Sequence, residues 1–207
     1  VLAMDLPGHA FTSQPPSDGL SLPAMARAVS GLLVGLRVSP EVVVGHSAGA
    51  AILMRMALDG AISPATLISL NGALLPFPGF AGIIFPPLAK LVTLSPFPAR
   101  MMSWRARDRA QVVDLIEGTG SKIDARALDL YQRLFQSEAH VHATLRMMAS
   151  WDLHALADAL PRLAVPLHLV VASEDRAVKP EHGLKVRDRV PGSNVAYLRG
   201  TGHLAHE

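Results

Sequence analysis

The stretch VVVGHSAGAAIL, residues 42–53, decides how the rest of the chain is interpreted. Its β-branched start is typical of a buried strand, and its alanine-rich end is typical of a helix. Ser47 lies between the two, with Gly45 and Gly49 two positions away on either side. The glycines either serve only to let strand and helix pack closely, or they accommodate a nucleophile elbow, a strained turn that presents the Ser47 hydroxyl clear of the backbone. The stretch alone does not decide between these readings.

Outward from this turn, short apolar runs alternate with helical patterns. The runs predict strands over residues 1–4, 42–44, 66–70, 167–172 and 195–198, and the intervening patterns predict helices over 25–36, 48–58 and 183–190. Unbroken apolar strands that alternate with helices are typical of a parallel sheet covered on both faces. The sequence therefore predicts an α/β fold.

A long insertion separates the third and fourth predicted strands. Residues 73–104 are rich in Pro, Phe and Met, and residues 110–148 show helical periodicity without strand signals. We expect a helical cap over 73–150 and a core formed by 1–72 and 151–207. The apolar segment Ile83–Leu94 is too short and too often interrupted by proline to span a membrane.

The composition narrows the classes of function. Half of the 207 residues are hydrophobic, which is enough for a sizeable core. Cysteine is absent, which excludes disulfides, thiolate metal sites and cysteine nucleophiles. Lys and Arg exceed Asp and Glu by only 19 − 17 = 2, so nucleic-acid binding is not indicated. The histidines show no metal-ligand spacing, so we expect no bound metal, and we also expect no cofactor. No signal or transit peptide is visible at the start of the sequence, so we expect a soluble cytoplasmic protein.

Two later loops supply the partners that a serine nucleophile needs, which are a base and an acid that orients the base. LHLVVASEDRAVKP, residues 167–180, is a strand that ends in two acids, of which Asp175 fits the Asp-x-x-Val-x-Pro pattern better than Glu174. NVAYLRGTGHLAHE, residues 194–207, is a strand followed by a glycine-rich turn and His203. Each feature alone has an ordinary structural reading, as a helix cap or a solvated loop residue. Their order and their places at strand ends favour a catalytic triad of Ser47, Asp175 and His203.

These motifs carry a resemblance to a known superfamily. DLPGHAFTS (5–13), GHSAGA (45–50), the Asp175 loop and GTGHLAHE (200–207) resemble the α/β hydrolases over nearly the whole chain. A narrower resemblance covers the insertion and its flanks, where four segments resemble the magnesium-chelatase accessory proteins of bacteriochlorophyll biosynthesis. These are ALDGAISPATLISLNGALLPFPG (57–79), IFPPLAKL (84–91), LIEGTGSKID (115–124) and MMASWDL (147–153).

The resemblance implies a role in the magnesium branch of tetrapyrrole synthesis in a photosynthetic bacterium, with magnesium chelatase subunits as partners. It implies no known reaction. The chelatase itself is driven by ATP, and this chain has no G-x-x-x-x-G-K-[ST] loop, so it is not the motor subunit.

The most concrete interpretation is a serine hydrolase that acts on an ester or a related acyl bond. Ser47 would attack, His203 would carry the proton, and Asp175 would hold the imidazole. The Ala48 backbone N–H would supply one oxyanion donor, and the second would lie upstream of residue 1. His46 and the cap aromatics would line a pocket for a bulky hydrophobic substrate such as a porphyrin or its ester, unless the rings only hold the cap to the core. These aromatics are Phe77, Phe80, Phe85 and Trp104.

Two other interpretations stay open. In the first, the chain is a non-catalytic accessory protein that binds a porphyrin or chelatase subunits and has inherited the triad. Alternatively, its Phe- and Pro-rich cap would contact the photosynthetic membrane peripherally.

The family's strand order also predicts a longer protein. In α/β hydrolases, three strands and the loop with the second oxyanion donor precede the strand that ends in DLPGH. Because we expect that strand at Val1–Met4, these parts would lie upstream, over roughly 60 to 90 residues at about 20 to 30 per unit. The 207-residue chain alone is expected to expose unpaired strand edges and to be poorly soluble and inactive.

Overall fold

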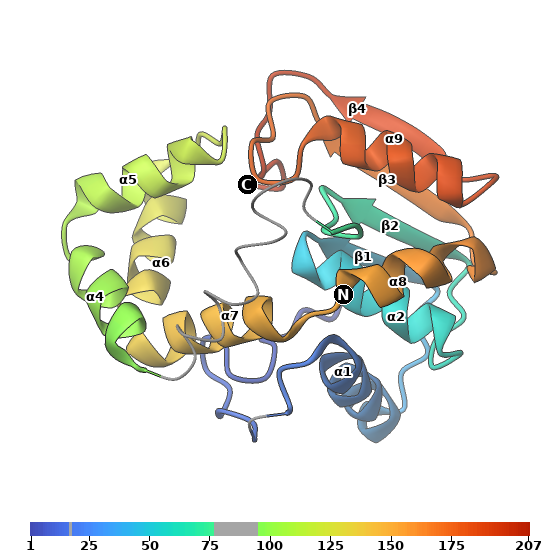
Figure 1. The fold of residues 1–207 in the computed structure, drawn as a ribbon, viewed down its shortest axis with the longest axis horizontal. Helices are drawn as coiled ribbons and strands as arrows, with labels where there is room; N and C mark the ends of the chain where they lie inside the picture. Colours follow the sequence, from blue (N-terminus) through green and yellow to red (C-terminus); the bar gives the residue numbers. More distant parts are fainter. Residues whose placement is uncertain (17, 77–94) are drawn as a thin grey trace. The chain divides into compact units, whose positions relative to one another are not determined.

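A four-stranded parallel sheet forms the centre of the fold in the computed structural model, which describes residues 1–16, 18–76 and 95–207. The strands are β1 (Val42–His46), β2 (Thr66–Leu70), β3 (Leu167–Ala172) and β4 (Asn194–Leu198), and they lie in the order β1-β2-β3-β4 (Figure 1). All three pairings are parallel, with Val43 opposite Leu67 and Leu67 opposite Leu167. Because the strands are parallel, their carboxyl ends, which carry the predicted site residues, lie along one edge of the sheet.

One face of this sheet forms the core of the unit. Leu67, Leu167 and Leu169 are buried there together with Val43. Helix α2 (Ala48–Leu58) packs against β1 and β2, and helix α9 (Pro180–Arg189) packs against β3 and β4. On the other face Val42 and Val44 of β1 are exposed among the described residues. Helix α1 (Leu22–Leu36) precedes β1 along the chain, and helix α8 (Leu153–Ala159) and the 3-10 helix η1 (Leu160–Arg162) precede β3.

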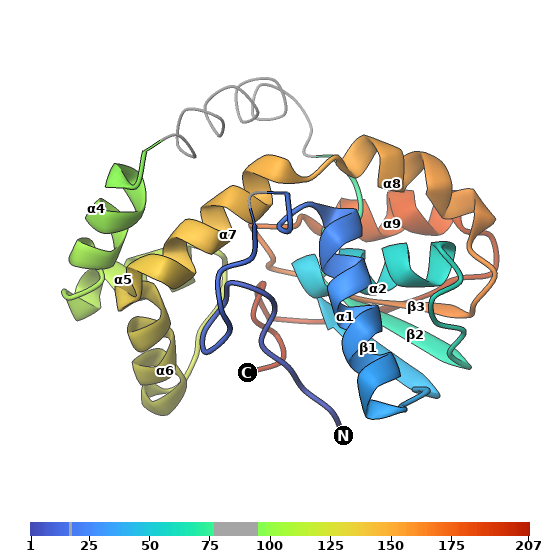
Figure 2. The ribbon, with the colours of Figure 1, turned by 90° about the horizontal axis from the view of Figure 1, so that it is seen from below.

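The insertion is helical where the structure describes it. It contains α4 (Phe97–Arg105), α5 (Arg109–Gly118), α6 (Ala125–Gln136) and α7 (Glu138–Ser150). Helix α4 contacts α6 and α7, and α6 contacts α7 (Figure 2). Asp124 and Ser137 begin α6 and α7 as N-caps, since their side chains accept hydrogen bonds from the backbone N–H groups of Ala127 and His140.

The chain divides into two compact units. The described parts of 1–25, 77–116 and 123–151 form the helical unit, and residues 26–76, 117–122 and 152–207 form the sheet unit. The six residues 117–122 therefore belong to the sheet unit although they lie between two helices of the helical unit. The division into a hydrolase core and a cap, with boundaries at 72 and 151, stays a prediction.

Most elements expected from the sequence are confirmed. The strands over 66–70 and 167–172 and the helix over 48–58 match the predicted bounds, and the other paired strands and the helices differ by a few residues at their ends. The strands were predictable because a continuous apolar run of five or six residues between turn residues is typical of a buried strand and is too short for most helices.

The predicted strand at Val1–Met4 is wrong, because these residues form no strand. Val1 and Leu2 are exposed, and none of the described strands pairs with them. The segment that follows packs on α7 instead, where Ala10 N–H donates to Nδ1 of His140 at 3.2 Å and Gln14 Nε2 donates to the carbonyl of Ala139 at 2.8 Å. An apolar run forms a strand only where a neighbouring strand satisfies its backbone groups. The expectation that further strands precede residue 1 stays a prediction.

Within the ranges that the structure describes, no helix has both the length and the apolar character needed to cross a bilayer.

Candidate active site

Ser47 lies at a strained turn between β1 and α2. Its backbone has φ 48° and ψ −113°, a left-handed conformation that residues with a side chain rarely adopt. The turn is held from both sides, since the Ser47 N–H donates to the carbonyl of Leu70 at 3.0 Å and the Ser47 carbonyl accepts from the Ala73 N–H at 3.1 Å. A serine at the start of a helix usually caps it, but the Ser47 side chain makes no cap hydrogen bond. The half-buried hydroxyl is therefore not used to stabilise the helix, and such local strain costs on the order of 1–3 kcal/mol.

The two glycines around Ser47 have different roles. A methyl group at Gly45 would lie 2.6 Å from the backbone of Ala50, so only glycine allows α2 to approach β1 this closely. A methyl group at Gly49 would have no other atom within 4 Å among the described residues. The close packing expected from the sequence is therefore a property of Gly45.

This difference predicts the outcome of a matched pair of substitutions. Gly45→Ala is expected to lower the free energy of unfolding by roughly 1–3 kcal/mol, because the backbones must move apart. Gly49→Ala is expected to be neutral or to stabilise by up to about 1 kcal/mol, because alanine is the better helix former. Urea unfolding followed by circular dichroism measures both. Equal destabilisation by the two substitutions would contradict the role given to Gly45.

Asp175 and His203 form a buried hydrogen-bonded pair. Nδ1 of His203 lies 2.7 Å from Oδ2 of Asp175, and Asp175 is only 3% exposed. The other carboxylate oxygen, Oδ1, accepts from the backbone N–H groups of Ala177 and Val178, both at 2.8 Å. Because a carboxylate only accepts, Nδ1 of His203 is the donor in this bond, which leaves Nε2 as the ring atom that can accept a proton.

Glu174, the rejected alternative, has an exposed side chain. Its backbone is nevertheless part of the site, since the Glu174 N–H donates to the carbonyl of Thr201 at 2.9 Å. This contact joins the loop of Asp175 directly to the loop of His203. Of the two acids, Asp175 is the one whose side chain contacts His203.

His46, the residue before Ser47, contacts the histidine loop. Its Nε2 lies 2.8 Å from the carbonyl oxygen of His203, to which it donates a hydrogen bond, and the two rings are 4.7 Å apart. The ring of His206 lies 4.2 Å from that of His46. Burial, followed by the charges of His203 and His206, lowers the pKa of His46 from 6.5 to about 4. His46 is therefore neutral at neutral pH and adds no positive charge beside His203.

The lowered pKa of His46 predicts a pH dependence of stability. The unfolded chain binds the His46 proton below about pH 6.5, whereas the folded chain binds it only below about pH 4. The free energy of unfolding therefore falls as the pH drops from 6.5 to 4, and His46 accounts for up to about 3 kcal/mol of that loss. Urea unfolding between pH 7 and pH 4 measures it. His46→Gln, which keeps a donor for the His203 carbonyl, is expected to show a flatter profile, and an unchanged profile would contradict this assignment.

Asn71 is a site residue that the sequence analysis missed. It follows β2 with φ 46° and is 3% exposed. Its Nδ2 donates to the carbonyl of His203 at 2.8 Å, and its Oδ1 accepts from the Ala172 N–H at 2.8 Å. One amide thus joins the end of β3 to the histidine loop. The Asn-Gly pair directly after a predicted strand was the available signal, because asparagine tolerates a positive φ and bonds nearby backbone.

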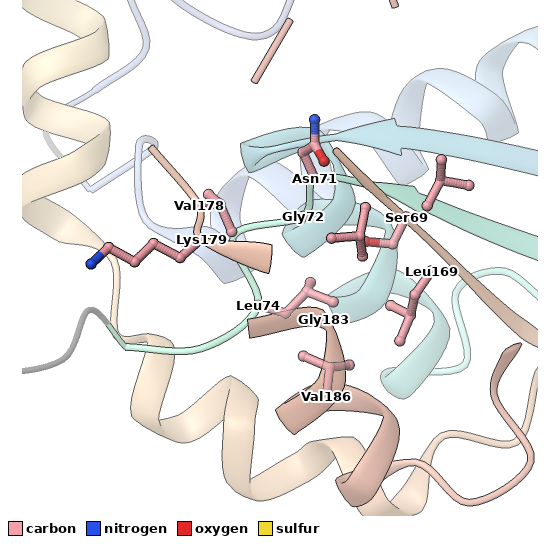
Figure 3. Close-up of a pocket in the computed structure, with 11 residues that line it drawn as sticks. Ser69, Asn71, Gly72, Leu74, Leu169, Val178, Lys179, Gly183 and Val186 are labelled. Atoms are coloured by element: carbon pink, nitrogen blue, oxygen red, sulfur yellow. The ribbon is translucent and has the colours of Figure 1, made fainter. Parts of the chain in front are cut away.

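A small cavity lies beside Asn71 on the core side of the sheet, where Ser69, Leu169 and Val186 line it (Figure 3). Its volume is about 10 Å³, which is room for about one water molecule. A larger cleft of about 370 Å³ lies within the helical unit. It is lined by Met102, Arg105, Ala106, Gln111, Val112, Asp114, Leu115, Phe135 and Val141.

The structure describes some of the remaining predicted site residues and not others. Ala48 is the first residue of α2, and the N–H groups of a helix's first turn have no partner inside the helix. Trp104 lies on α4, is 65% exposed and does not line the 370 Å³ cleft. Phe77, Phe80 and Phe85 lie outside the described residues. The substrate contacts assigned to these aromatics and to His46 stay predictions.

The described residues contain no group of three or more His, Asp or Glu side chains arranged to hold a metal ion.

Comparisons with known proteins show the family and the fold of the chain. The chain is 37% identical to the magnesium-chelatase 30 kDa subunit of Rhodobacter capsulatus, over 207 residues that make up all of this chain and 72% of that protein. A crystal structure of an α/β hydrolase fold protein from Burkholderia ambifaria superimposes with a TM-score of 0.77 at 22% identity, covering 98% of this chain and 74% of the other. An esterase from Exiguobacterium antarcticum superimposes with a TM-score of 0.73 at 16% identity, covering 96% and 72%. At these identities the two solved structures show the fold alone. The model of the alpha/beta hydrolase family matches residues 1–207, and the chain therefore belongs to that family.

Proposed function

We propose that this protein is a serine hydrolase that cleaves an ester or a related acyl bond. The observation that carries the proposal is the buried 2.7 Å hydrogen bond between His203 and Asp175. An oriented imidazole whose Nε2 can accept a proton is what a serine nucleophile requires. The strained turn at Ser47 supports it, because the chain retains a conformation that costs stability and leaves the hydroxyl out of the helix cap.

The proposed reaction has two steps. Ser47 Oγ bonds to the acyl carbon while His203 Nε2 takes the hydroxyl proton, and the protonated ring then gives that proton to the leaving alcohol as the C–O bond breaks. Water cleaves the resulting acyl-serine by the same route, which releases the acid and restores the hydroxyl. Asp175 holds the Nδ1 proton throughout and stabilises the transient imidazolium. The Ala48 N–H would stabilise the oxyanion.

The class of substrate is proposed from the similarity to a magnesium-chelatase subunit, and a cleft within the helical unit is consistent with it. This 370 Å³ cleft is within the size range of ligand pockets and has apolar walls from Met102, Leu115 and Phe135. Arg105 and Asp114 also line it and would orient polar groups of a ligand. We infer a bulky hydrophobic ester, with porphyrin esters as the candidates that the similarity to a magnesium-chelatase subunit suggests.

A second candidate function is favoured by that similarity alone. The protein would then be a non-catalytic partner of magnesium chelatase, and the His203–Asp175 pair would be an inherited structural feature. Peripheral contact with the photosynthetic membrane would be compatible with either candidate.

A fluorophosphonate probe tests the hydrolase proposal, because it bonds covalently only to an activated serine. In the full-length natural protein, we expect a single label on the peptide that contains Ser47, identified by mass spectrometry, together with hydrolysis of short aryl esters. Absence of the label from folded protein would exclude the hydrolase mechanism and favour the second candidate.

A further inference from the structure

The turn Thr119–Ser121 lies between α5 and α6 in sequence, but its contacts are with the loops of Asp175 and His203. It belongs to the segment 117–122 that groups with the sheet unit. The Gly120 N–H donates to the Glu117 carbonyl at 2.9 Å and so closes the end of α5, but this contact does not explain why the turn bonds to the two loops.

The Thr119 carbonyl joins the two loops. It accepts from the N–H of Arg176 at 3.1 Å and from the N–H of His203 at 3.4 Å. Arg176 directly follows the acid, so one carbonyl oxygen fixes the backbone beside both members of the pair. A carbonyl oxygen has two lone pairs and can accept both bonds at once.

Ser121 holds the next residue of the histidine loop. Its Oγ accepts from the Leu204 N–H at 2.8 Å and lies 2.8 Å from Oγ1 of Thr119. Ser121 is only 3% exposed, so water does not compete freely for these bonds. The backbone on both sides of the His203 side chain is therefore anchored to the same turn.

Two glycines make the close approach sterically feasible. Gly120 has φ 82°, and a methyl group there would lie 1.9 Å from the carbonyl oxygen of Glu174. A methyl group at Gly202 would lie 2.2 Å from the backbone of Gly120. Backbone therefore packs directly against backbone where the turn, the acid loop and the histidine loop meet.

We propose that the Thr119–Ser121 turn is a positioning element that sets the His203 ring against Asp175 and toward Ser47. The proposal rests on the hydrolase function proposed above and adds three residues to its machinery. A misplacement of about 1 Å at a reacting group can lower a rate by about 100-fold. A turn that holds the histidine backbone at two successive N–H groups prevents such a displacement.

Removing the Ser121 hydroxyl is the mildest test. Ser69→Ala is the matched control, since Ser69 is buried in the same unit and its hydroxyl has no hydrogen-bond partner among the described residues. Labelling rates with the fluorophosphonate probe are measured well below the melting temperature of each variant. We expect Ser121→Ala to be labelled on the order of 10- to 100-fold more slowly than wild type, and Ser69→Ala to be labelled at the wild-type rate. Equal rates for the two folded variants would overturn the proposal, because a purely structural role changes stability and not the rate of the folded protein.

A second pair tests the close approach of the turn independently of the Ser121 hydroxyl. Gly120→Ala is compared with Gly118→Ala, where a methyl group would have no other atom within 4 Å among the described residues. Slow labelling of Gly120→Ala alone is expected, and wild-type labelling of both would overturn the proposal.

A spectroscopic readout separates this proposal from the hydrolase proposal. The proton between His203 Nδ1 and Asp175 Oδ2, which are 2.7 Å apart, is expected to give a strongly downfield proton resonance whether or not the protein is a hydrolase. We expect Ser121→Ala to shift or broaden this resonance and Ser69→Ala to leave it unchanged. If wild-type protein is not labelled, the hydrolase function fails, and the resonance alone decides whether the turn positions His203.

Discussion

Ser47→Ala is expected to abolish labelling by a fluorophosphonate probe and to lower ester turnover by on the order of 10³-fold or more. The physical reason is that no other atom at the elbow can bond to the acyl carbon, so His203 and Asp175 have nothing to activate. The fold should survive, because the Ser47 side chain makes no cap hydrogen bond. Ser193→Ala is the matched control, since Ser193 is also half-buried and its hydroxyl has no partner in the described part of the chain.

The same variant separates the two candidate functions in the cell. If Ser47→Ala no longer restores pigment synthesis to a strain that lacks the gene, while Ser193→Ala does, the hydrolase reaction is the biological role. If Ser47→Ala restores pigment as well as wild type, the hydrolase role is wrong and the accessory role explains the similarity to a chelatase subunit.

His203→Ala and Asp175→Asn are expected to lower ester turnover to different extents. His203 carries the proton, so its removal should lower turnover by on the order of 10³-fold or more. Asp175→Asn keeps the ring and its volume but replaces one acceptor oxygen by an amide, which favours the wrong tautomer of His203 and still leaves a base in place. Turnover of Asp175→Asn should therefore exceed that of His203→Ala by roughly 10-fold or more. Steady-state hydrolysis of an aryl ester measures both.

Glu174→Gln is the control for the acid. Its side chain is exposed, so turnover should equal that of wild type. Loss of activity in Glu174→Gln beside an active Asp175→Asn would reverse the assignment and would show that the 2.7 Å contact to His203 is not the functional one.

Sequence reasoning succeeded where the signal is local. The strands that end near Ser47 and Asp175 were predictable because each is a continuous apolar run followed by turn residues. It failed at Val1–Met4, where the same kind of run forms no strand because it has no pairing partner in the described chain. The strain at Ser47 was expected from the motif, but its φ of 48° and the absence of a cap hydrogen bond were visible only in the structure.

The family, the order of Ser47, Asp175 and His203, and their places at strand ends could all be predicted from the sequence, because these depend on residues close together along the chain. Only the folded structure shows which groups hold these three residues in place. Asp175 and His203 are 28 residues apart, Ser121 and Leu204 are 83 apart, and His46 and His203 are 157 apart. Such contacts depend on how β1, β2 and β3 pair and on how closely Gly120 and Gly202 let three loops approach. No local pattern encodes these distances, because each requires that the whole sheet has already formed.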